Sequence, residues 1–394
     1  MRAVPSHAVL PLRSLSLAYF VQATGALSVV GSLAAIAGEW GLSETQAALL
    51  VTVFGVTFAV AAPLLQVAFG HLPRRRQVLI GLSLFSSAAL LFALAPNYPA
   101  LLSARVAMGL GAALIGPALG ALAAGLVEPP QQGSAIAMVL LGLSLAGLLG
   151  MPLAAWVAHA WGARALFLLI GAMGIGTALL LRGVLPRQDG APAVSLATLG
   201  RALADPLLLP GYLVVFFIAS AVYATYAFIA PFIRDVFHGG AHTVSAGLTV
   251  LGVAGVLDNL FVVRAARQHS ANTMLLAGIG LLALDLLLLM LAPPSLAVLF
   301  AALLLWAFAT DIVWPSQQRR IVALSVELRG VALALTASFV FAGIAFGSAL
   351  AGPLYVHFGF HANLLASLGL LLLATACLLL PFNKPSQAGP ARSS

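Results

Sequence analysis

The sequence of 394 residues is 62% hydrophobic and only 7% charged, whereas soluble proteins carry about 25% charged residues. Its 18 basic and 10 acidic side chains are too few to cover the surface of a soluble fold of this size. Since a helix crosses a bilayer with about 20 apolar residues, the composition predicts an all-α membrane protein.

Twelve apolar stretches of this length follow one another along the chain. In order they are 14–37, 45–69, 77–94, 100–126, 134–158, 165–184, 208–233, 244–263, 272–291, 295–317, 330–356 and 362–380. The longest polar stretch between them, 185–206, contains Pro, Gly and Asp, which predicts an exposed linker with a short surface helix at 195–204. We therefore expect two six-helix pseudo-symmetric halves, 1–184 and 207–394.

The charges are distributed unevenly between the loops. With a cytoplasmic N-terminus, the cytoplasmic segments hold fifteen basic residues and the outer loops only Arg164 and Arg234. This asymmetry predicts that both termini and the linker are cytoplasmic. The net charge of +8 then reflects topology, with membrane lipid and no nucleic acid as partner. We expect a multi-pass protein of a bacterial-type cytoplasmic (inner) membrane.

Small residues recur every few positions in three predicted spans. Such stripes allow two helix backbones to approach closely in lipid, and their equivalent places in the two halves suggest surfaces along which the halves rock. General helix packing is the simpler explanation for any single stripe. The stripes are Ala112, Gly116, Gly120 and Ala124 in the fourth span, Gly142, Ala146 and Gly150 in the fifth, and Gly343, Gly347 and Ala351 in the eleventh. The predicted helix-packing motifs also include Gly109, Gly111, Gly147 and Pro152.

The fourth span reads Arg105-Val-Ala-Met-Gly109-Leu-Gly111, and the fifth runs from Gly142 through Gly150 to Pro152. These motifs resemble those of the major facilitator superfamily, and the chain is most similar to its twelve-span branch of drug and sugar efflux proton antiporters. The resemblance covers nearly the whole chain. It implies the major facilitator fold, an association of Arg105 with proton transfer, and a cavity lined by the first, fourth, seventh and tenth spans.

The loop after the second span departs from the family pattern. Gln66 stands at the first glycine of the inner-gate motif and Gly70 at its acidic position, so that only the basic end, Arg74 and Arg75, is preserved. In the family the missing aspartate is thought to lock the gate through a charge contact. Asp258, at a comparable place in the second half, is a candidate for a compensating contact.

Ionisable residues within the spans are candidates for the mechanism, because each costs about 2.5 to 3.5 kcal/mol at the bilayer centre. Asp311 is the strongest proton-coupling candidate, since it lies well inside the tenth span and Pro315 can free backbone carbonyls nearby. Arg105 either pairs with a carboxylate or attracts an anionic substrate. Asp258 lies near a span end, where a snorkelling group is the alternative. Asp285, surrounded by leucines, has no evident partner.

Neutral polar and aromatic residues are the candidates for a substrate cavity. In the first span, Thr24 and Ser28 share a helix face and Gln22 lies nearby, although Ser and Thr commonly bond to their own helix instead. In the seventh span, Tyr223 and Tyr226 share a face and either stack on a substrate or pack in the core. Trp306 precedes Asp311 by five positions.

These features predict a secondary transporter that exports a small organic solute, sugar-like or drug-like, in exchange for protons. An uptake symporter on the same fold is the alternative. A membrane enzyme is a weaker third possibility, because Gly142-Leu-Ser-Leu-Ala lacks the last glycine of a nucleophile elbow. We expect no metal and no cofactor, and a monomer as the functional unit.

Overall fold

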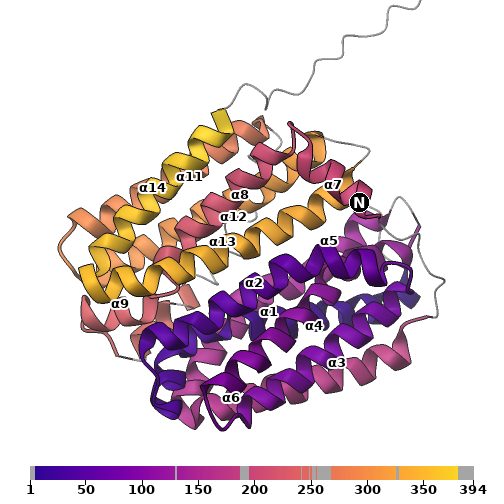
Figure 1. The fold of residues 1–394 in the computed structure, drawn as a ribbon, viewed down its shortest axis with the longest axis horizontal. Helices are drawn as coiled ribbons and strands as arrows, with labels where there is room; N and C mark the ends of the chain where they lie inside the picture. Colours follow the sequence, from indigo (N-terminus) through magenta and orange to yellow (C-terminus); the bar gives the residue numbers. More distant parts are fainter. Residues whose placement is uncertain are drawn as a thin grey trace, which may run out of the picture.

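The computed structural model describes residues 5–128, 131–186, 195–240, 242–247, 249–250, 254, 268–324 and 328–379. Within these ranges all regular structure is helical, and the long helices lie side by side in one bundle (Figure 1). This agrees with the predicted all-α class.

The first set of helices is defined here as the N-terminal group. It comprises α1 Ser6–Trp40, α2 Glu44–Phe69, α3 Arg74–Ala93, α4 Tyr98–Gly125, α5 Gln132–Leu145, the single π-helical turn η2 Ala146–Gly150, and α6 Met151–Val184. The C-terminal group comprises α8 Leu209–Tyr226, α9 Ile229–Asp235, α11 Ala271–Leu291, α12 Leu296–Leu324, α13 Arg329–Phe358 and α14 Phe360–Leu379. The short α7, Leu196–Ala204, lies between the groups in sequence and confirms the predicted surface helix, with the Ser195 hydroxyl capping its first turn.

Ten stretches of the described residues are long and apolar enough to cross a membrane. One of them, Ser134–Val184, contains both the fifth and the sixth predicted spans. It bends at Gly162, whose φ of 89° lies in a region that L side chains rarely adopt. The predicted span 244–263 lies largely outside the described residues.

The two groups lie against each other along α2 and α13, which run beside one another in the middle of the bundle (Figure 1). The rings of Phe58 and Phe341 are 3.9 Å apart between centroids. Nearby, the Ser348 hydroxyl donates a hydrogen bond of 3.3 Å to the carbonyl of Ala48. Contacts of this kind hold the groups together through packing and a few weak polar bonds.

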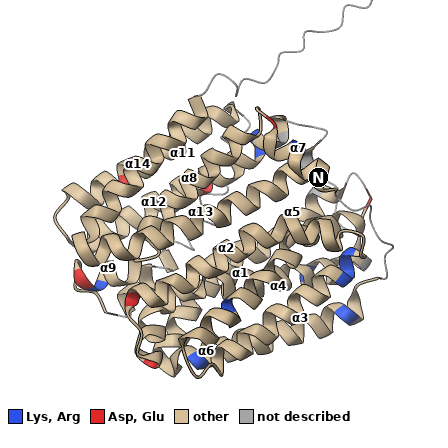
Figure 2. Ribbon diagram, viewed as in Figure 1, with Lys and Arg blue, Asp and Glu red and all other residues tan. Residues whose placement is uncertain are grey.

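Charged residues gather at the two ends of the helices, with few along their middles (Figure 2). One end holds the arginines 74 to 76 and Arg182, and the other holds Glu39, Glu44, Arg164 and the neighbours Arg234 and Asp235. The outer faces between these ends expose large apolar side chains such as Leu372 and Leu179. An apolar belt between two polar ends is the surface that a bilayer requires.

Glycines bring helices of the same group into direct backbone contact. A Cβ on Gly142 would overlap the Ser16 carbonyl oxygen of α1, and one on Gly347 would overlap the Ser220 carbonyl oxygen of α8. Gly343 meets α8 in the same way, at Phe216. The stripes of α5 and α13 therefore pack within a group, and the expectation that they form the surface between the halves is wrong. Glycines that do face the other group are Gly55 of α2, against Phe341, and Gly352 of α13, against Thr45.

The remaining positions of the predicted packing motifs differ in their surroundings. A Cβ on Gly109 would lie 2.9 Å from Thr57 of α2, and one on Gly111 would lie 2.7 Å from the Gly81 carbonyl oxygen of α3. A Cβ on Gly147 would have no neighbouring atom of another segment within 4 Å. Pro152 is buried at the start of α6. Gly147 lies off the helix face that Gly142, Ala146 and Gly150 share, which accounts for its open surroundings.

We expect Gly142→Ala to lower stability and Gly147→Ala to leave it unchanged or slightly raised. The first substitution places a methyl group on the α1 backbone, an overpacking that costs about 1–3 kcal/mol, whereas the second meets open space. Thermal unfolding of both variants in detergent measures the difference. Equal midpoints would contradict the described contact between α5 and α1.

Candidate functional site

A cluster of buried side chains joins the two groups near the middle of the bundle. The Tyr226 hydroxyl of α8 donates to the Met151 sulfur of α6 over 3.4 Å. The Tyr226 ring lies 4.7 Å from that of Trp306 on α12 and 5.6 Å from that of Tyr223, both in edge-to-face arrangements. We call Met151, Tyr223, Tyr226 and Trp306 the central cluster. Three of its four members are predicted cavity residues; Met151 was not.

The π turn η2 determines the position of Met151. It ends at Gly150, whose missing side chain makes room for the Thr24 hydroxyl of α1. Thr24 Oγ1 and Gln22 Oε1 are buried and have no hydrogen-bond partner among the described residues. Since π turns within helices are frequent at functional sites, the open Thr24 hydroxyl beside this turn is suited to receive a ligand.

Ser28, the third predicted polar residue of the first span, has a different role. Its hydroxyl donates to the Gly25 carbonyl over 3.2 Å within α1, and the side chain is fully buried. This is the intrahelical bond that short hydroxyl side chains commonly form. Ser28 is thus engaged by its own helix rather than open to a ligand.

Arg105 is fully buried on α4 and binds backbone carbonyls of two other helices. Its guanidinium donates to Leu50 of α2 over 3.1 Å, to Gly25 of α1 over 3.0 Å and to Ala26 over 2.9 Å. It also lies 4.6 Å from the centre of the Phe54 ring. Carbonyl dipoles and the ring face compensate the charge. In this conformation Arg105 therefore joins α1, α2 and α4.

The loop between α2 and α3 is held by uncharged partners. Arg74 donates to the side-chain oxygens of Gln66 and Gln77, each over 3.1 Å. Gln77 in turn donates to the carbonyls of Phe69 and Leu72, which flank the buried Gly70. Arg75 donates to the Arg182 carbonyl of α6. Amide and carbonyl oxygens thus occupy the place of the acidic partner that the family motif would supply.

The predicted carboxylates lie at different depths. Asp311 is half-buried on α12, about one and a half turns beyond Trp306. Its role in proton coupling stays a prediction. Asp258 lies outside the described residues.

A cavity of about 600 Å³ opens between the groups, within the range usual for ligand pockets. Small residues of α1 and α6 form one wall, and Ala230, Gly239 and Gly240 belong to the other. Its polar lining includes Ser32, Glu39, His159 and Arg234. A space of this size between two helix groups can admit a small organic molecule.

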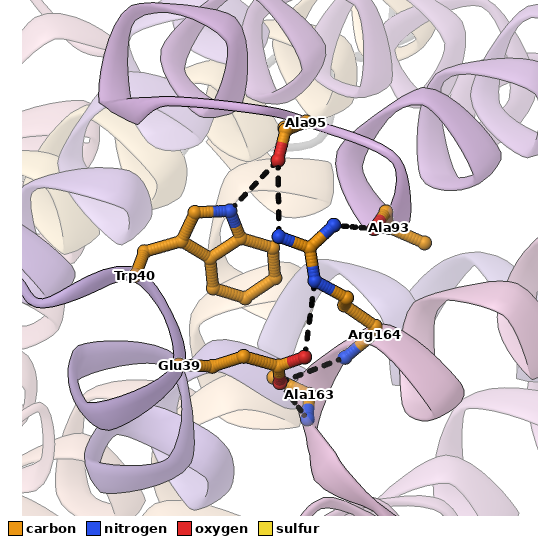
Figure 3. A network of polar contacts seen from close by, with 6 residues as sticks. All are labelled: Glu39, Trp40, Ala93, Ala95, Ala163 and Arg164. Atoms are coloured by element: carbon orange, nitrogen blue, oxygen red, sulfur yellow. Dashed lines mark hydrogen bonds and ion pairs between the residues drawn. The ribbon is translucent and has the colours of Figure 1, made fainter.

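Glu39, one of the residues that line this cavity, belongs to a polar network, which Figure 3 shows. Glu39, at the end of α1, accepts hydrogen bonds from the backbone N–H groups of Ala163, over 2.7 Å, and Arg164. The Arg164 guanidinium lies 3.1 Å from Glu39, 4.6 Å from the Trp40 ring, and donates to the Ala93 and Ala95 carbonyls. Sequence reasoning missed Glu39, although an acidic residue ending a span opposite one of two outer arginines was a usable signal.

A second set of charges links the two groups at the same end of the bundle. Arg234, in the last turn of α9, lies 2.7 Å from Glu44 at the start of α2. It also pairs with Asp235, which accepts a hydrogen bond from Tyr355 of α13. Because Glu44 and Arg234 belong to different groups, this ion pair must break if the groups separate at that end.

Comparison with known proteins assigns this arrangement to a family. Residues 15–319 and 212–394 match the model of the Major Facilitator Superfamily. The chain belongs to the Major Facilitator Superfamily. It is therefore a multi-pass membrane transporter, from a family that is not one of enzymes.

Relatives of this Major Facilitator Superfamily chain include both sequences and solved structures. It is 25% identical over 375 residues to the uncharacterised MFS-type transporter YbcL of Bacillus subtilis (strain 168), covering 95% of this chain and 96% of the relative. An inward-facing, unoccupied bacterial homologue of the human lysosomal transporter Spinster superposes with a TM-score of 0.69 at 17% identity, covering 97% and 95% of the two chains. The human organic anion transporter MFSD10 (TETRAN) gives 0.69 at 18% identity, covering 95% and 100%. These two structures support the fold.

Within the described part of the chain, no group of three or more His, Cys, Asp or Glu side chains is placed to hold a metal ion.

We expect Arg105→Lys to destabilise the protein markedly. One ammonium group cannot reach the carbonyls of α1 and α2 together, so at least one charge-assisted hydrogen bond is lost, worth about 1.5–3 kcal/mol. Thermal unfolding checks this, with Arg201→Lys on the exposed α7 as control. An unchanged midpoint in Arg105→Lys would show that the three carbonyl contacts do not hold α1, α2 and α4 together.

Glu39→Gln should lower stability by about 1 kcal/mol, since it removes an ion pair that is partly screened by solvent. The difference in stability between Glu39→Gln and wild type should become smaller as the salt concentration is raised, because salt weakens the ion pair of the wild type. Thermal unfolding at low and high ionic strength measures both effects. The exposed Glu128→Gln serves as control, and a deficit independent of salt would count against the ion pair.

Proposed function

We propose that the chain is a proton-coupled exporter of a small organic solute, sugar-like or drug-like, that works by alternating access. In this proposal the halves 1–184 and 207–394 move against each other about a solute held at the central cluster. The protein acts as a monomer in a bacterial-type inner membrane, with its termini and the linker 185–206 on the cytoplasmic side. The clustering of Arg74, Arg75 and Arg76 at the start of α3 beside Arg182 at the end of α6 supports this orientation.

One observation carries the proposal: the central cluster is built from both groups. Tyr226 and Trp306 come from the C-terminal group and Met151 from the N-terminal group, and Thr24 of α1 lies against Gly150, next to Met151 in the chain. A solute bound there would contact both groups at once. Its binding would therefore depend on how the groups are placed, which is the condition for alternating access.

The chemistry of the cluster favours a neutral or weakly charged solute. Aromatic faces bind the apolar face of a sugar or drug, while amide and hydroxyl groups orient it. The cluster itself contains no charged side chain. The larger cavity beyond it has both signs of charge, with Glu39 on one side and Arg234 on the other, so organic anions belong in a test panel as well.

The opposite direction of transport, proton-coupled uptake, remains the alternative on the same fold. The two directions differ in the sign of the coupled flux. In proteoliposomes of known orientation, an exporter exchanges solute against protons, whereas a symporter carries both the same way.

We expect a solute panel of a sugar, an amphipathic cation and an organic anion to reveal flux driven by an imposed pH gradient. For the transported solute, Tyr226→Phe should raise the half-saturation concentration several-fold, because the hydroxyl that fixes the ring against Met151 is lost. Tyr98→Phe is the matched control, because it likewise removes a tyrosine hydroxyl that forms a hydrogen bond, here to the Gln46 carbonyl at the start of α2. Flux that is unaffected by the pH gradient for every transported solute would refute proton coupling.

A further inference from the structure

Asp285 is the one acidic or basic residue on α11 and lies about two thirds of the way along it. Its side chain is 3% exposed, and its Oδ1 has no hydrogen-bond partner among the described residues. Nothing in the central cluster, the cavity or the polar networks makes use of it. A buried carboxylate within a membrane span requires a physical reason.

Asp285 borders a small cavity inside the C-terminal group. The cavity measures about 10 Å³, at the lower limit for a single water molecule. Four helices contribute its lining, which consists of Ala221, Val222 and Thr225 of α8, Leu282, Asp285 and Leu286 of α11, Trp306 of α12 and Leu371 of α14. Asp285 is the only charged member of this lining.

The lining of this cavity contains no basic side chain that could pair with Asp285. The other titratable or charged side chains of the four surrounding helices do not line the cavity. They are Tyr212, Tyr223 and Tyr226 on α8, Asp311, Arg319 and Arg320 on α12, and His361 and Cys377 on α14. An ionised, unpaired carboxylate is strongly unfavourable in such surroundings, whereas the neutral acid is tolerated. The charged form therefore needs another conformation in which Asp285 meets water or a cation.

The site suits a proton better than a metal cation. Hard cations require about six or more oxygen ligands, and the lining provides one carboxylate and one hydroxyl. That hydroxyl, Thr225 Oγ1, is already hydrogen-bonded to Ser367 of α14 over 2.9 Å. Ser367 in turn bonds to the Ala221 carbonyl over 2.8 Å. A proton needs only the one carboxylate oxygen and almost no space.

The same cavity is directly connected to the central cluster. Trp306 lines the cavity and contacts the Tyr226 ring. Thr225, also in the lining, precedes Tyr226 on α8. A change of charge on Asp285 therefore acts on the two helices that carry the aromatic part of the central cluster.

We infer that Asp285 is the carboxylate that binds and releases the transported proton. In one conformation the carboxylate takes a proton from water and becomes the neutral acid; in the other it returns that proton to water and is again the carboxylate. This inference rests on the proposed function and deepens it, and it assigns to Asp285 the role that the sequence suggested for Asp311.

Infrared difference spectroscopy of the reconstituted protein tests the site without any solute. Wild type should show a carbonyl stretching band of a protonated carboxylic acid that disappears at alkaline pH. The band should be absent in Asp285→Asn and present in Asp311→Asn. An unchanged band in Asp285→Asn overturns the inference, whether or not the protein transports protons.

Trp306 provides a second measurement that needs no variant of Asp285. The part of the fluorescence due to Trp306, obtained by subtracting the signal of Trp306→Phe from that of wild type, should titrate together with the infrared band. Fluorescence that stays constant over that pH range contradicts the assignment. This measurement keeps the inference testable even if Asp285→Asn does not fold.

Transport assays separate the inference from the proposed function. With a solute found in the panel, Asp285→Asn should lose at least ten-fold in proton flux while exchange of labelled for unlabelled solute continues. Asp311→Asn should keep its proton flux. Normal proton flux in Asp285→Asn refutes the inference alone, whereas a wild type that moves the solute without protons refutes the proposed coupling.

Discussion

Inside a bilayer no water is available to hydrogen-bond a polar group, so each such group must find its partner within the protein. Arg105 illustrates how much structure this demand creates, because its guanidinium finds three carbonyls on two other helices. These bonds join α4 to α1 and α2, and Gly109, which lies against Thr57 of α2, allows α4 and α2 to approach closely. Charge satisfaction and close packing thus act on the same helix contacts.

The same demand separates the buried polar groups into two kinds. Arg105 and Ser28 have their hydrogen bonds and serve the fold. Gln22, Thr24 and Asp285 keep buried oxygens without a partner among the described residues. Open groups are costly in lipid, so the presence of Thr24 beside the central cluster, and of Asp285 in a cavity connected to it, is best explained by a ligand or proton that occupies them for part of a transport cycle.

Apolar run lengths and linker composition are local properties, which is why the sequence predicted the spans that lie within the described residues and the short α7. The partners of side chains depend on which helices meet, and local pattern does not contain that. Gly120 and Gly142 both belong to stripes of small residues in the sequence, yet only Gly142 touches another backbone. Asp285 seemed unexplained among leucines because its cavity is formed by helices distant in sequence. Met151 was missed because a thioether gives no polar signal.

The π turn at Ala146–Gly150 connects α5 and α6 and contains one residue more than an α-helical turn would have there. An α-helix turns by about 100° per residue. If the extra residue were absorbed, the segment beyond it would rotate by about that angle and carry the Met151 sulfur away from the Tyr226 hydroxyl. The π turn therefore allows one defined rotation of α6, at the place where the two groups meet, that a continuous α-helix would not allow.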